Sequence, residues 1–159
     1  MRRTSDIEIV RVDDHNYPKF DDMVFWRMSG RERTDVERLG EAPCDFAGER
    51  AALANPNLFV YAAHDSGKFV GWISIVYLPK VGRLKGLGHL YVDELWVEPT
   101  YRRRGIAARL LKVADELLDK TASAGVRLYV NTDNPGAKRL YEKCGFRVCD
   151  TAYFMEKDR

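Results

Sequence analysis

Three consecutive arginines stand directly before a glycine and two small residues in the segment YRRRGIAARLL, residues 101–111. Like charges repel, so the cluster indicates either a solvated charge run or a site for an anion. At a helix start, backbone N–H groups lack partners and the helix dipole adds roughly half a positive charge, so a phosphate can bind there. Gly105 permits a conformation that a Cβ would resist, and Ala107 and Ala108 leave room for a bulky anion. The segment therefore predicts a phosphate-binding turn.

The same turn differs from two common nucleotide sites. It lacks the Lys-Ser/Thr end of a Walker A loop and the GxGxxG of a dinucleotide-binding fold. ATP and NAD are therefore poor candidates for the ligand whose phosphates bind at this turn.

The elements around the turn predict a mixed α/β domain. Alternating or continuous apolar patterns predict strands at 6–12, 57–65, 68–78, 89–99, 126–130 and 146–156. Helical spacing of apolar residues predicts helices at 17–28, 43–54, 104–120 and 134–144. Ser66 and Gly67 predict a hairpin turn, so the three middle strands should form an antiparallel meander. The polar segment 29–42 gives no clear prediction.

Length and composition indicate one domain, residues 1–159, because 45% hydrophobic and 11% aromatic residues are enough for a core. The longest nearly apolar stretch, 69–79, is too short to cross a bilayer, and residues 1–10 lack the apolar region of a secretion signal. We therefore expect a cytoplasmic protein with no membrane partner. The formal charge of +2 gives no general reason to expect nucleic acid as a partner.

The cysteines and histidines indicate reduced thiols and no metal. Cys44, Cys144 and Cys149 form no CxxC pair, and an odd number argues against a disulfide framework. The three histidines are scattered at 15, 64 and 89, so we expect no metal centre.

Two segments resemble a known family. ELWVEPTYRRRGIAARLL, residues 94–111, resembles motif A of the GNAT superfamily of acetyl-CoA-dependent N-acetyltransferases. Arg102, Gly105 and Ala107 match its signature Arg/Gln-x-x-Gly-x-Gly/Ala. LYVNTDNPGAKRLYEKCGF, residues 128–146, resembles motif B. The residues that match motif B are Asn134, Ala137, Tyr141, Gly145 and Phe146.

The resemblance implies a GNAT-like fold and a place for acetyl-CoA. The implied fold is α/β (α+β), with a mixed, mostly antiparallel sheet of six to seven strands, about four flanking helices and two splayed central parallel strands. The implied binding residues for the coenzyme A phosphates are Arg102, Arg103, Arg104, Gly105, Ile106, Ala107 and Ala108. The backbone of Leu95, Trp96 and Val97 would pair with the pantetheine arm, and an N–H near Val97 would stabilise the oxyanion.

Asp93 and Glu94 are two adjacent carboxylates in an otherwise apolar strand. Burying their charges costs free energy, so we expect them to be solvated or to have a functional role. Apolar positions change parity around them, which predicts a β-bulge, and the resemblance implies a bulge at this place. An acceptor amine arrives as an ammonium and must lose a proton, so either carboxylate is a candidate base. The sequence leaves open which one faces the cleft, and one of them can be a surface residue.

Asn134 and Tyr141 each have two interpretations. Asn134 precedes Pro135, so its side chain predicts a helix cap, while the resemblance implies a contact near the pantetheine. Tyr141 can be a half-buried core residue. The resemblance instead implies the acid that protonates the departing thiolate, because a phenol with a pKa near 10 is protonated at neutral pH.

We therefore expect an N-acetyltransferase that moves an acetyl group from acetyl-CoA to a primary amine of a small molecule or peptide by direct attack. The alternatives are a non-catalytic acyl-CoA-binding regulatory module and, less favoured, a nucleic-acid binder that uses the arginines.

The resemblance places acceptor specificity at 17–56, 79–88 and 150–156. Acids suited to a cation there are Asp21, Asp22, Glu41 and Asp45, and aromatic residues are Phe25, Trp26, Phe46 and Tyr153. A homodimer is compatible with these residues.

Overall fold

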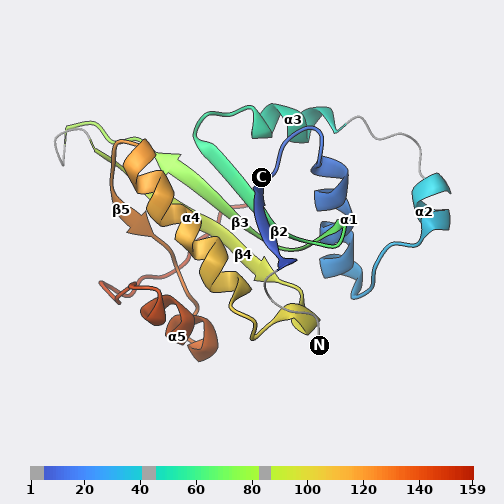
Figure 1. The fold of residues 1–159 in the computed structure, drawn as a ribbon. Helices are drawn as coiled ribbons and strands as arrows, with labels where there is room; N and C mark the ends of the chain where they lie inside the picture. Colours follow the sequence, from blue (N-terminus) through green and yellow to red (C-terminus); the bar gives the residue numbers. More distant parts are fainter. Residues whose placement is uncertain (1–5, 41–45, 83–86) are drawn as a thin grey trace. The chain divides into compact units, whose positions relative to one another are not determined.

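The computed structural model describes residues 6–40, 46–82 and 87–159. Two units are distinguished, Met1–Tyr129 and Val130–Arg159. The first unit contains a sheet of five described strands in the order β1-β2-β3-β4-β5 (Figure 1). The expected α/β class is confirmed, but the described residues give five strands rather than six or seven.

The elements of the first unit follow one another as expected, with two additions. The strands are β1 (Glu8–Arg11), β2 (Leu58–Asp65), β3 (Lys68–Leu78), β4 (Gly88–Val97) and β5 (Ser123–Arg127). The helices are α1 (Tyr17–Ser29), α2 (Asp35–Gly40), α3 (Ala47–Leu53), the 3₁₀ helix η3 (Pro99–Tyr101) and α4 (Ile106–Lys120). The additions are α2 and η3, and the start predicted for α3, residues 43–45, lies outside the described residues.

The expected antiparallel meander is confirmed. β2 pairs with β3 and β3 pairs with β4, both antiparallel. The hairpin turn has positive φ at Ser66 (48°) and Gly67 (89°), the backbone twist that two-residue hairpins prefer.

The sheet is mixed because β5 runs parallel to β4. The register runs from Gly88 opposite Ser123 to Tyr91 opposite Arg127. The strand predicted at 126–130 is thus displaced toward the N-terminus. The start of β4 pairs with 123–127, and this pairing rather than the apolar run VRLYV sets the strand boundaries.

Helices cover the sheet. α1 covers the face that carries Trp72, with the rings of Phe20 and Trp72 5.3 Å apart. Ile73 and Ile75 point to the opposite face because strand residues alternate, and both are fully buried. α4 lies along β2 to β5 (Figure 1) and buries the stripe Ile106, Leu110, Leu111, Val113, Ala114 and Leu117. The apolar stripe expected for this helix is confirmed.

The second unit contains one helix, α5 (Pro135–Lys143). Gly145, at φ 92°, follows its end, as expected. The prediction of a strand at 146–156 is wrong for this structure, in which these residues contain no strand. An alternating apolar pattern needs a partner for its backbone. Here the side chains of Tyr153, Phe154 and Met155 are 85–96% exposed.

Candidate active site

The turn between β4 and α4 is fixed by a buried carboxylate. Glu98 is 5% exposed, and its side chain accepts hydrogen bonds from the backbone N–H of Thr100, at 2.7 Å, and from the Thr100 hydroxyl. The N–H of Glu98 donates to the carbonyl of Val70 in β3 at 2.9 Å. The turn is therefore attached to the sheet at its first residue.

A second attachment comes from η3. The hydroxyl of Tyr101 donates to Oδ2 of Asp65 at 2.7 Å, and Asp65 is 6% exposed at the end of β2. The hydroxyl of Ser66 also donates to this carboxyl group, at 3.0 Å. The β2–β3 hairpin thus supports the turn that precedes α4.

The three arginines of the turn differ in their contacts, although all are exposed. Nε of Arg102 donates to the carbonyl of Val97 at 2.9 Å. Arg104 donates to the carbonyl of Thr100 at 3.1 Å and lies over the ring of Tyr101, 4.9 Å from its centre. In the described part of the chain, the Arg103 guanidinium has no such contact. Its charge is therefore the most available of the three to an anion.

Gly105 takes the left-handed conformation expected of it, with φ 75°, and α4 begins at the next residue. Apart from its neighbours in the chain, a Cβ on Gly105 would have no described protein atom within 4 Å, so the space above the turn is open. Ile106 is buried, while Ala107 and Ala108 are half-buried. The N–H groups of the first turn of α4 thus open onto a small-residue surface beside three cations, an arrangement suited to a phosphate.

The last part of β4 extends beyond its pairing with β5. That pairing ends at Tyr91, whereas β4 continues to Val97 and pairs with β3 along its other edge. Leu95, Trp96 and Val97 lie in this extension. The backbone edge that would pair with an extended ligand is therefore on the β5 side of β4.

The β-bulge predicted at the two carboxylates is confirmed. Glu94 is opposite Ser74, but Ile75 is opposite Val92, so Asp93 is the extra residue in β4. Asp93 is exposed. The pKa of Tyr91 is raised above its ordinary value, first by the burial of Tyr91 and then by the negative charge of Asp93.

Glu94 lies on the α1 face of the sheet. Its Oε2 accepts a 3.2 Å hydrogen bond from Nε1 of Trp72 and is 3.6 Å from Nη1 of Arg27. The Arg27 guanidinium also lies over the Trp72 ring, 5.0 Å from its centre. These contacts distinguish Glu94 from Asp93, a distinction that the sequence left open.

In the second unit, Asn134 caps α5. Its Oδ1 accepts a 3.1 Å hydrogen bond from the N–H of Ala137, so the cap interpretation is confirmed. Tyr141 is half-buried near the end of this helix, and burial raises the pKa of its phenol above the ordinary value of 10. Its ring packs edge-on against Phe146 at 6.0 Å. The phenol is therefore protonated at neutral pH, as the acid interpretation requires.

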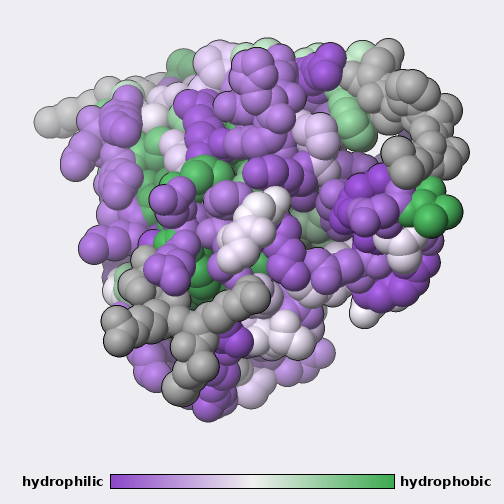
Figure 2. All heavy atoms as spheres, turned by 45° about the vertical axis from the view of Figure 1, so that its right-hand side comes forward, coloured by the Kyte–Doolittle hydropathy of each residue, from purple (hydrophilic) through white to green (hydrophobic). Residues whose placement is uncertain are grey.

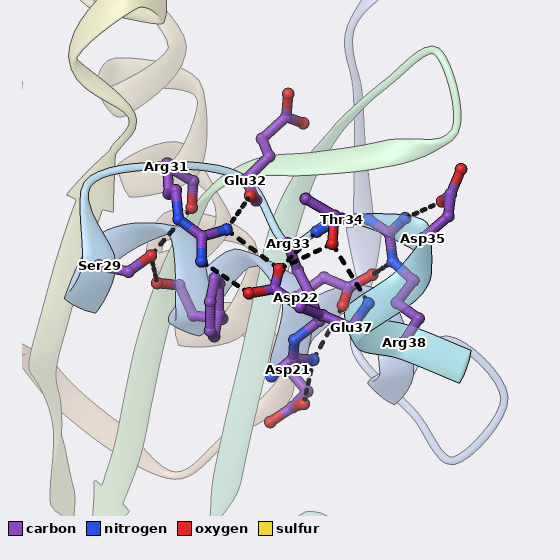
Figure 3. Close-up of polar contacts among 11 residues, drawn as sticks. Asp21, Asp22, Ser29, Arg31, Glu32, Arg33, Thr34, Asp35, Glu37 and Arg38 are labelled. Carbon is purple, nitrogen blue, oxygen red and sulfur yellow. Dashed lines mark hydrogen bonds and ion pairs between the residues drawn. The ribbon is translucent and has the colours of Figure 1, made fainter. Parts of the chain in front are cut away.

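The segment between α1 and α2 is held by ion pairs that no sequence pattern predicts (Figure 3). Nη1 of Arg33 is 2.8 Å from Asp21 and 3.0 Å from Asp22, and Arg38 also contacts Asp22, at 3.1 Å. The carboxylates of Asp21 and Asp22, considered for a cationic acceptor, are thus already paired with arginines. Glu41 and Asp45 lie outside the described residues.

Neither membrane spans nor metal groups are found in the described ranges. No helix there is long and apolar enough to cross a membrane. His, Cys, Asp and Glu side chains in these ranges form no group of three that could hold a metal ion. The surface turned forward in Figure 2 is mainly hydrophilic.

Comparison with known proteins identifies a family and several relatives. Residues 21–146 match the model of the acetyltransferase (GNAT) family. The chain is 35% identical over 109 residues to N-alpha-acetyltransferase RimI of Mycobacterium tuberculosis, which covers 69% of this chain and 65% of RimI. It is 29% identical over 160 residues to mycothiol acetyltransferase of Mycobacterium leprae, covering 96% of this chain and 47% of the relative. The chain thus spans less than two thirds of the length of these relatives.

Solved structures share the fold. The structure of AAC(6')-Iy, in complex with the bisubstrate analog CoA-S-monomethyl-acetylneamine, superposes with a TM-score of 0.74 at 14% identity. The match covers 96% of this chain and 99% of the other.

Proposed function

The chain belongs to the acetyltransferase (GNAT) family, and we propose that it transfers an acetyl group from acetyl-CoA to a primary amine of a small molecule or peptide by direct attack. The observation that carries this proposal is the turn before α4. Gly105 in the left-handed conformation, the open space above it and the adjacent arginines provide an anion site beside the free edge of β4.

The proposed roles in binding follow from this geometry. The N–H groups of Gly105, Ile106, Ala107 and Ala108 hold the pyrophosphate, and Arg102, Arg103 and Arg104 add positive charge. The edge of Leu95, Trp96 and Val97 pairs with the pantetheine arm as an added strand.

The proposed chemistry is a direct acetyl transfer assisted by one base and one acid. Glu94, oriented by the Trp72 N–H, accepts a proton from the acceptor ammonium so that the neutral amine can attack the thioester carbonyl. An N–H near Val97 stabilises the oxyanion. Tyr141 donates a proton to the departing thiolate, and the second proton that the amine loses as the amide forms passes to the Tyr141 phenolate and restores the phenol. We assign the base role to Glu94 rather than Asp93 because the Glu94 carboxylate is held on the sheet face that α1 covers. The helix α1 belongs to segment 17–56, one of the segments proposed to bind the acceptor.

The acceptor class is supported by the relatives. They are named an N-alpha-acetyltransferase and a mycothiol acetyltransferase, and the structure of AAC(6')-Iy contains the bisubstrate analog CoA-S-monomethyl-acetylneamine. We propose that residues 1–159 act as a single acetyltransferase domain, because the family match spans both units. We also propose that the protein acts in the cytoplasm, where a thiol such as that of the exposed Cys149 stays reduced. Sedimentation equilibrium would determine whether the protein acts as a homodimer.

A screen of amine acceptors tests the proposal by following the release of free thiol from acetyl-CoA. The panel contains diamines, aminoglycosides and short peptides with free N-termini. We expect amine-dependent thiol release with at least one class. Tight acetyl-CoA binding without turnover on any amine would instead indicate a non-catalytic acyl-CoA-binding module.

A further inference from the structure

Arg27 occupies a position suited to another cation. Trp72, Trp96 and Glu94 form what we call the tryptophan–glutamate cluster. The two rings are 5.2 Å apart, and Trp72 and Trp96 are opposite one another on β3 and β4. The Arg27 guanidinium, from the last turn of α1, lies over Trp72 and next to Glu94.

The cluster has the features of a cation site. The electron-rich face of a tryptophan attracts a cation within about 6 Å, and Arg27 lies 5.0 Å from the Trp72 ring centre. The Trp72 N–H holds Oε2 of Glu94. Within the described part of the chain, Oε1 of Glu94 has no hydrogen bond, so the carboxylate can still accept a donor.

Arg27 is held there weakly. Its nitrogen is 3.6 Å from Glu94, longer than the roughly 2.7–2.9 Å of a strong charge-assisted hydrogen bond. The Arg27 and Glu94 side chains are 41% and 50% exposed, and such pairs contribute little to stability. A soluble cation can therefore replace the guanidinium at small cost.

We propose that the tryptophan–glutamate cluster is the subsite for the protonated amine of the acceptor, and that Arg27 competes for it as an internal cation. This inference rests on the proposed function and specifies which side chains hold the ammonium form of the acceptor before Glu94 takes its proton. Arg27 is then a specificity-determining residue, because an acceptor must displace its charge.

Nitrogen-15 NMR of the indole N–H groups tests this proposal without acetyl-CoA. The chain has three tryptophans, so the resonances can be assigned from single Trp→Phe variants. The probe is n-butylammonium, with n-butanol as the neutral match and butyrate as the anionic one. We expect n-butylammonium to shift the Trp72 resonance, and Arg27→Gln to lower its dissociation constant about two- to fivefold, the range of an exposed ion pair. Glu94→Gln should abolish the shift.

The matched control is Arg11→Gln. Arg11 lies over the ring of Phe59, 5.4 Å from its centre, and its replacement removes the same charge at another site. An equal gain in this variant would attribute the effect to overall charge and overturn the proposal. The proposal would also be overturned if n-butylammonium shifted the Trp72 resonance no more than n-butanol does, or shifted the Trp26 resonance alone. Butyrate binding that is lost in Arg27→Gln would overturn it as well. Because the measurement needs no turnover, these failures are distinct from an absence of thiol release, which would contradict the proposed function.

Discussion

The Tyr101 hydroxyl donates a 2.7 Å hydrogen bond to the carboxyl group of Asp65, joining the turn before α4 to the end of β2. The two residues are 36 positions apart in the sequence. Together with Glu98, this contact fixes the segment from which the arginines and Gly105 extend. The proposed phosphate site therefore depends on the β2–β3 hairpin as well as on its own residues.

Tyr101→Phe should destabilise the protein. The variant keeps the ring under Arg104 but removes one hydrogen bond to a carboxyl group that is 6% exposed. Hydrogen bonds to charged groups contribute about 1.5–3 kcal/mol, so we expect a loss of this size in the free energy of unfolding, measured in urea. Tyr153→Phe, at a side chain that is 96% exposed, is the control and should change little. Equal stability of the two variants would show that the Tyr101 contact does not hold the turn.

Gly105→Val should weaken acetyl-CoA binding by about 1–3 kcal/mol, the cost of lost charge-assisted hydrogen bonds. A Cβ at Gly105 would meet no protein atom within 4 Å other than its neighbours in the chain, so the added side chain would extend into the open space proposed for the ligand. Calorimetric titration of acetyl-CoA measures the effect.

Gly30→Val is a matched control for backbone strain. Gly30 ends α1 with φ 76° and ψ 4°, close to the 75° and 8° of Gly105, and it also has open space at the Cβ position. Both variants should lose similar stability, but only Gly105→Val should lose affinity. Unchanged affinity in folded Gly105→Val would contradict the phosphate assignment.

Arg103→Gln should weaken acetyl-CoA binding about three- to tenfold at low salt, because the Arg103 charge is the most available to phosphate. Salt screens exposed charges, so the difference from wild type should decrease at high ionic strength. Arg50→Gln, on the exposed side of α3, removes the same charge elsewhere and should leave the affinity unchanged. A wild-type affinity and salt dependence in Arg103→Gln would place the phosphates away from this residue.

Tyr141→Phe should lower kcat roughly 100-fold while acetyl-CoA affinity is kept, if Tyr141 is the acid. Burial raises the pKa of this phenol above 10, so it stays protonated from pH 7 to 9. The defect should be smaller at high pH, where the thiolate needs a proton less.

Stability must be measured beside the rate for Tyr141→Phe. A hydroxyl that served only packing would shift the free energy of unfolding by about 1 kcal/mol and leave kcat nearly intact. Tyr129→Phe, at a side chain that is 77% exposed, is the control. Wild-type kcat in Tyr141→Phe across pH 7 to 9, with chemistry rate-limiting, would leave water as the acid.

Local signals predicted most of the fold. The bounds of β3 follow from its apolar run and its hairpin turn, and the bulge at Asp93 follows from the change of parity. The polar segment 29–42, for which the apolar pattern gives no clear prediction, also carries a sequence signal for α2. Thr34 and Glu37 form a capping box, in which the N–H of Thr34 donates to Glu37 at 2.8 Å and the N–H of Glu37 donates to Thr34 at 3.2 Å.

Contacts between distant residues could not be predicted. No local pattern pairs Tyr101 with Asp65, or places Arg27 over Trp72, because these contacts exist only once the chain has folded. The pairing of Asp21 and Asp22 with Arg33 has the same origin. The apolar patterns at 126–130 and 146–156 were misleading because a strand needs a partner, which periodicity alone does not supply.

Transfer of a labelled acetyl group tests the central claim most directly. The protein is incubated with acetyl-CoA carrying a carbon-13 acetyl group and with the amine panel, and the products are analysed by NMR and mass spectrometry. We predict that the label appears in an amide of one amine class, with one free thiol per amide formed and no product when the protein is omitted. Label found only in acetate, or an unchanged thioester in the presence of bound protein, would contradict acetyl transfer to an amine.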